Sequence, residues 1–170
     1  MKKLSEAEVR KAIDAIHTEE EAVAVMSAFA ENQPELAAYI DASCENFTRT
    51  EKFFLMTSAS TIWHIITSAS GPVPTITRAS IGKIVADLDT EFRPFFVDQG
   101  DDPLKSIQSI IAHSSQGELL LSLIGILLAG AEENTTGEDA LRDEMMQSLF
   151  YRLLVIIEVI SRSESVAQVH

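Results

Sequence analysis

LLLSLIGILLAGA, residues 119–131, is the most uniformly apolar stretch of the chain. Eight of its thirteen residues are leucine or isoleucine, and none is charged. A surface helix keeps one polar face, so a helix that is apolar nearly all round is expected to be buried on every side. Thirteen helical residues span only about 20 Å, too short for a bilayer core of about 30 Å. We therefore predict a buried central helix over residues 117–131, around which the other helices pack.

Small residues recur along one face of this predicted helix. Ser122, Gly125 and Ala129 are spaced by three and four residues, which places them on the same side. A face of small residues lets another helix approach closely. We favour a close crossing with another helix of the same chain, because such faces are ordinary packing devices inside domains. A seam between two copies of the chain is the alternative.

Local signals for helices run through the rest of the chain. Capping boxes, in which a Ser or Thr is followed three residues later by Glu, occur at Ser5, Thr18, Thr48, Ser115 and Thr135. Five acid–base pairs, Glu158–Arg162 among them, have the four-residue spacing that suits a helix surface. Strand-like alternation is almost absent. We predict an all-α bundle of seven or eight helices, over residues 5–16, 18–31, 34–47, 49–69, 76–93, 103–113, 117–131 and 137–161.

The length of the chain suits one compact domain. A chain of 170 residues can bury a full core, so we predict a single helical domain over residues 1–170. The segment SGPVP, residues 70–74, is the clearest break, because proline and glycine stop helices. It would separate an N-terminal layer, 1–70, from a C-terminal layer, 75–162. Five residues are more often a loop than a domain linker.

Charge and cysteine content restrict the partners and the compartment. The chain has 26 acidic and 13 basic residues, a formal net charge of −13. This balance opposes binding to nucleic acid and to anionic membranes, both of which need a basic surface. It permits a basic protein partner. The single cysteine, Cys44, cannot form an internal disulfide, and neither a signal peptide nor a lipidation motif is recognisable, so we predict a cytoplasmic protein.

No residue pattern typical of a metal or cofactor site stands out. Of the four histidines, only His17 has an acid, Asp14, three residues before it, so the helical di-metal motif is not indicated. Residues 132–143 resemble a calcium loop slightly. The residues at its first, eighth and twelfth positions depart from that pattern, and we interpret the segment as an acidic loop before the last helix. We predict no metal and no cofactor.

Trp63 and His64 mark the candidate pocket. They are neighbours in the uncharged stretch 53–77. A histidine in a pocket can transfer protons or hold a ligand. No carboxylate near it in sequence could orient the ring, so we favour a partly buried histidine that is bonded to a carbonyl or hydroxyl group.

These observations favour a non-catalytic protein-interaction module that associates with itself. The sequence has no catalytic pattern and an acidic composition. Two predicted helices, 49–69 and 137–161, also have more apolar surface than one internal face needs. Two alternatives remain. One is a small-molecule-binding or enzymatic pocket near Trp63 and His64, and the other is an acidic decoy or inhibitor of a basic partner. We expect a homo-oligomer or a protein partner, and neither nucleic acid nor a membrane.

Overall fold

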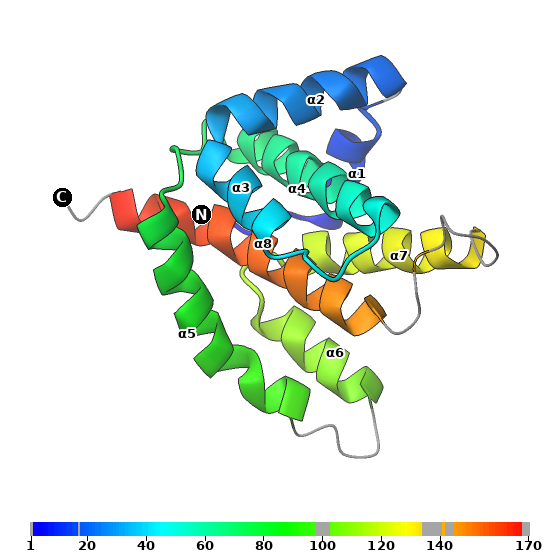
Figure 1. Cartoon of the computed structure of the whole chain (residues 1–170), viewed down its shortest axis with the longest axis vertical. Coiled ribbons are helices and arrows are strands. Elements are labelled where there is room, and N and C mark those ends of the chain that lie inside the picture. The colour runs from blue at the N-terminus through cyan, green and yellow to red at the C-terminus, as the bar shows by residue number, and fades with distance from the viewer. Residues whose placement is uncertain (1, 17, 98–102, 134–140, 142–144, 168–170) are drawn as a thin grey trace.

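A computed structural model describes residues 2–16, 18–97, 103–133, 141 and 145–167 of the chain. Within these ranges the side chains are described up to residue 92, for 107–126, for 141 and for 145–163. The described residues form helices and no strand, which confirms the all-α prediction (Figure 1). The helices are α1 Glu6–Ile13, α2 Glu19–Asn32, α3 Pro34–Ala42, α4 Arg49–Ser70, α5 Arg78–Val97, α6 Pro103–His113, α7 Gly117–Glu133 and α8 Met146–Ala167.

Three of the predicted capping boxes start helices. The hydroxyl groups of Ser5, Thr18 and Thr48 each accept from the backbone N–H three residues later, and the Glu there returns a bond to the cap backbone. The box at Thr18 separates α1 from α2. These contacts form within a single turn, so local sequence is sufficient to specify them.

The other two predicted boxes have different outcomes. The box at Thr135 lies outside the described residues, as does the predicted start of the last helix at residue 137. The box at Ser115 is wrong, because α7 begins two residues later, at Gly117. Among the described residues the Ser115 hydroxyl has no hydrogen-bond partner, and its backbone N–H donates to the side chain of Glu158 at 2.7 Å. The carboxylate of Glu158, which is distant in sequence, thus bonds to Ser115 in place of the predicted box with Glu118.

The break after α4 is a loop that α2 holds in place. Gly71 adopts a φ of 94°, a conformation that glycine reaches without strain. Gln33 is fully buried, and its amide nitrogen donates to the carbonyls of Val73 and Pro74, at 3.4 and 3.1 Å. Its side-chain oxygen accepts from the N–H of Ile76 at 2.9 Å. One side chain thus satisfies three backbone groups of the loop.

α8 is the centre of the core. Every side chain from Leu153 to Ser161 is buried, because α8 packs against α4 on one side, against α5 on another, and against α7 (Figure 1). Helices from both sides of the 70–74 loop therefore contribute to one hydrophobic core. The division into layers 1–70 and 75–162 stays a prediction.

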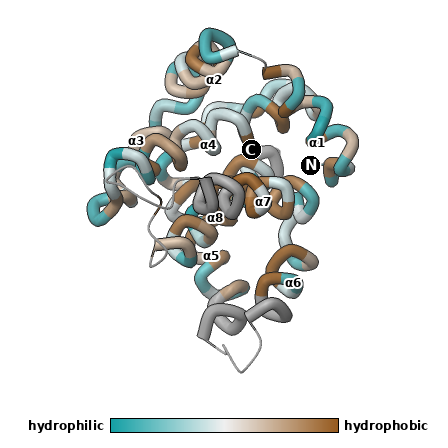
Figure 2. The backbone as a smooth tube through the Cα atoms, turned by 90° about the vertical axis from the view of Figure 1, so that its right-hand side faces the viewer, coloured by the Kyte–Doolittle hydropathy of each residue, from teal (hydrophilic) through white to brown (hydrophobic). Residues whose placement is uncertain are grey.

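The prediction that residues 117–131 form the buried central helix is wrong over the described side chains. Leu119, Leu120 and Leu123 are buried, but Leu121 is 50% exposed and Ile126 is 45% exposed. α7 lies at the edge of the bundle, where α1, α6 and α8 cover only part of its circumference (Figure 1). In Figure 2 the described part of α7 has mainly hydrophobic colours, whereas α1 and α2 have mixed colours. The apolar composition of α7 therefore does not mean that other helices cover every face of it.

No helix in the described part of the chain is both long enough and apolar enough to cross a membrane.

Candidate functional site

The small residues of α7 lie toward its open side. Ser122 is partly buried, and its hydroxyl donates to the carbonyl of Glu118, at 2.9 Å. Gly125 is exposed, and a Cβ atom placed there would meet no described atom within 4 Å. Ala129 belongs to α7, but its side chain is outside the described set. No described residue makes the close intramolecular crossing that we favoured at Gly125.

Exposed apolar side chains surround this glycine. Leu121 precedes Gly125 by four residues, and Ile126 follows Ser122 by the same spacing, so the four residues share a face. We call these four residues the outer face of α7. None of them is charged. Phe53 and Val23 are also exposed, but they belong to α4 and α2. Single exposed apolar residues are common on proteins, whereas large contiguous apolar patches occur at interaction sites.

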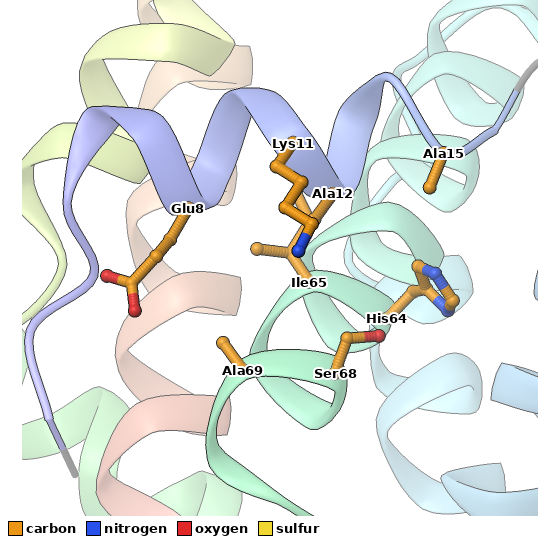
Figure 3. Close-up of a pocket in the computed structure, with 8 residues that line it drawn as sticks. All are labelled: Glu8, Lys11, Ala12, Ala15, His64, Ile65, Ser68 and Ala69. Atoms are coloured by element: carbon orange, nitrogen blue, oxygen red, sulfur yellow. The ribbon is translucent and has the colours of Figure 1, made fainter.

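His64 lines an open groove between α1 and α4, with a volume of about 380 Å³. In Figure 3, Lys11 of α1 and His64 and Ser68 of α4 project into the space between the two helices, and Glu8 lies toward the start of α1. The groove is completed by apolar side chains, Ala12, Ala15, Ile65 and Ala69.

The carboxylate of Glu8 is already engaged. It accepts from the ammonium group of Lys2 at 2.7 Å, and from the backbone N–H and the hydroxyl of Ser5 at 2.9 and 2.8 Å. The bond from Lys2 and those from Ser5 lower the pKa of Glu8 from 4.5 to about 2. This carboxylate is therefore a strong cap for α1 and a weak general base.

Trp63 belongs to a different part of the molecule. Its ring packs on Phe29 of α2, with centroids 6.1 Å apart and planes tilted by 58°. Its indole nitrogen is buried and has no hydrogen-bond partner among the described residues. Consecutive helix residues point about 100° apart, so Trp63 faces α2 while His64 faces α1. The structure does not bring the two side chains into one pocket.

Sequence reasoning missed a buried polar cluster around Glu158. This carboxylate is fully buried in α8. Its Oε1 accepts from the Ser114 hydroxyl and the Ser115 N–H, both at 2.7 Å, and its Oε2 accepts from Nε of Arg162, at 2.8 Å. Arg162 also pairs with Glu91 of α5, at 2.8 Å. The prediction that Glu158 and Arg162 form a pair on the helix surface is therefore wrong for Glu158. The apolar residues on both sides of Glu158 in the sequence could have indicated that it is buried.

The cluster extends to the N-terminal segment through Gln116. Gln116 is 1% exposed, and it accepts from the N–H of Leu4 and donates to the carbonyl of Lys2, both at 2.9 Å. Burial opposes the charge of Arg162, but its bonds to Glu91 and Glu158 outweigh burial and raise its pKa. The Glu158 carboxylate is fully buried and accepts three hydrogen bonds, so it links helices together and is not accessible to a substrate.

The remaining reactive groups form no metal site in the described part of the chain. No three His, Cys, Asp or Glu side chains of the described residues could jointly hold a metal ion. Cys44 is 1% exposed, and burial raises the pKa of its thiol, which opposes formation of a nucleophilic thiolate. Nearly all of the loop at 132–143 lies outside the described side chains.

No protein-family model, no curated protein and no solved structure matches the chain. The functional proposal therefore rests on the geometry of the chain itself.

Proposed function

We propose that this protein is a non-catalytic interaction module that pairs, through the outer face of α7, with the same face of a second copy. The observation that carries the proposal is the half-exposed pair Leu121 and Ile126 beside the open Gly125. Covering this face would remove two large apolar side chains from water, and this removal favours association.

Two features of the face favour a second copy as its occupant. A helix can approach closely at Gly125, because there is no Cβ and no described atom above it. The four residues of the outer face are also uncharged, although the chain has a net charge of −13, so the centre of such a contact would hold no carboxylate. A twofold pair of antiparallel helices centred on Gly125 would set position 121, a leucine, opposite position 129, an alanine.

The α1–α4 groove is a weaker basis for a function. It is open, its carboxylate is engaged by Lys2 and Ser5, and Trp63 lies elsewhere. We therefore prefer association through α7 to a small-molecule or catalytic role at His64.

Gly125→Leu tests the proposal, with Gly82→Leu of α5 as its matched control. Both glycines are exposed helical positions with no described atom within 4 Å of a new Cβ. Each substitution should raise stability by about 0.5–1 kcal/mol through helix propensity. Only Gly125→Leu should weaken association, because its side chain fills the space that a second helix would occupy. Sedimentation velocity across a concentration series measures the association.

The expected result is a wild-type dimer that persists in Gly82→Leu and dissociates in Gly125→Leu. A wild-type chain that stays monomeric at high concentration would reject the proposal. So would a dimer that Gly125→Leu leaves intact.

A further inference from the structure

A second hollow lies between the start of α8 and the loop that joins α3 to α4. It has a volume of about 450 Å³. In Figure 1 this loop passes close to α8. Five of the eight described residues that line the hollow have polar or charged side chains, namely Ser43, Glu45, Asn46, Ser148 and Arg152. Four of the eight described residues that line the α1–α4 groove are polar or charged, so the hollow beside α8 has the more polar lining.

Arg152 supplies the positive charge of this hollow. It is partly buried, and no carboxylate of the described residues forms an ion pair with it, although Glu45 lines the same hollow. The carboxylate of Asp89 also acts on Tyr39, and the charge of Arg152 reaches two neutral side chains, Tyr39 and Cys44. Burial raises the pKa of both, and the positive charge of Arg152 opposes that rise. The described residues thus give the partly buried guanidinium group no ion pair, and a charge that is partly withdrawn from water favours a partner of opposite sign.

We propose that this hollow binds a small oxyanion, the carboxylate or phosphate group of a ligand, through Arg152. The guanidinium group presents N–H donors in a planar fork that matches both anions. Ser148 precedes Arg152 by four residues and lies on the same face of α8. Asn46, from the α3–α4 loop, lines the opposite wall. Ser43 contributes less, because its hydroxyl donates to the carbonyl of Ile40, at 2.9 Å.

Glu45 opposes the anion and provides a variant with the reverse effect. An exposed carboxylate in the lining reduces the attraction of the hollow for a second negative charge. Glu45→Gln should therefore strengthen binding, whereas Arg152→Gln should weaken it. Adventitious binding to surface lysines would not respond to these two variants in opposite directions.

The test uses the full chain at constant ionic strength, titrated with inorganic phosphate and, separately, with acetate. The Arg Nε–H resonances are followed by nuclear magnetic resonance. We expect one arginine resonance, absent from Arg152→Gln, to shift in a saturable way. Saturation by phosphate alone identifies a phosphate site, and saturation by acetate identifies a site that accepts carboxylates. The failure of both anions to saturate would overturn the proposal.

The variants separate the hollow from the rest of the surface. Arg152→Gln should weaken the saturable binding by about tenfold or more, since charge-assisted hydrogen bonds are lost. Arg49→Gln, which removes an exposed arginine outside the hollow, should leave it unchanged. If Arg152→Gln does not fold, Ser148→Ala and Glu45→Gln still test the site through a modest loss and a modest gain. Equal affinity in Glu45→Gln, Ser148→Ala and the wild-type chain would overturn the proposal, whatever the oligomeric state.

Discussion

α7 and α8 are both rich in leucine and isoleucine, but they are buried to different extents. α7 has no charged residue between positions 119 and 131, yet it exposes about half of Leu121 and nearly half of Ile126. α8 includes Glu158, and every side chain from Leu153 to Ser161 is buried. The difference shows that burial depends on how many neighbours surround a helix. α8 lies among α4, α5 and α7, whereas α7 lies at an edge.

The same comparison explains how a carboxylate can lie at the centre of the core. An unpaired buried charge is strongly unfavourable, but Glu158 accepts from a hydroxyl, a backbone N–H and a guanidinium group. The donors Ser114 and Ser115 belong to the loop between α6 and α7. Glu158 of α8 therefore helps to attach the N-terminal end of α7 to the bundle.

The largest expected effect is that of Glu158→Ala. It leaves Arg162 with one partner and two donors of the α6–α7 loop with none, so we expect a loss of about 3–5 kcal/mol in the free energy of unfolding. Glu6→Ala is the control, because it breaks an exposed ion pair with Arg10 and should cost less than about 1 kcal/mol. Urea denaturation measures both. Equal losses would show that the Glu158 cluster does not hold the helices together.

A leucine in each helix tests the comparison directly. Leu153 of α8 is fully buried, and Leu153→Ala should cost about 2–5 kcal/mol through lost burial and a residual cavity. Leu121 of α7 is half exposed, and Leu121→Ala should cost less than about 1 kcal/mol when the protein is dilute enough to be monomeric. Denaturation curves at low protein concentration check both values. A loss at Leu121 as large as that at Leu153 would mean that α7 is enclosed within the monomer.

The smallest expected effect concerns a partly exposed carboxylate, Glu8, as a contrast to the buried Glu158. The pKa of Glu8 falls from 4.5 to about 2 because Lys2 and Ser5 bond to its charged form. Its contribution is therefore fully present above pH 4.5 and is lost as the pH falls toward 2. Glu8→Gln should flatten the dependence of stability on pH in that window.

Thermal midpoints measured between pH 2 and pH 5 check this expectation. Glu6→Gln serves as the comparison, because it removes a carboxylate of the same helix outside the capping box. A Glu8→Gln variant that keeps the wild-type slope would show that the bonds from Lys2 and Ser5 do not persist in solution.

The candidate surfaces were predictable only in part. The spacing of Ser122 and Gly125 indicated a face that another helix could approach, but not whether a helix of the same chain covers it. The adjacency of Trp63 and His64 suggested one pocket, yet helix geometry turns the two side chains toward different neighbours. The hollow at Arg152 joins residues more than one hundred positions apart, such as Ser43 and Ser148, so no local pattern indicated it.

The sequence by itself determined where the helices form. Capping residues, apolar periodicity and the 70–74 break act within a few positions, so the helices and the boxes at Ser5, Thr18 and Thr48 follow from local chemistry. Only the tertiary structure decided which helix is central. The burial of a side chain depends on neighbours that come from distant parts of the chain. For this reason α8, with a carboxylate at its middle, became the core, and α7 kept an open face.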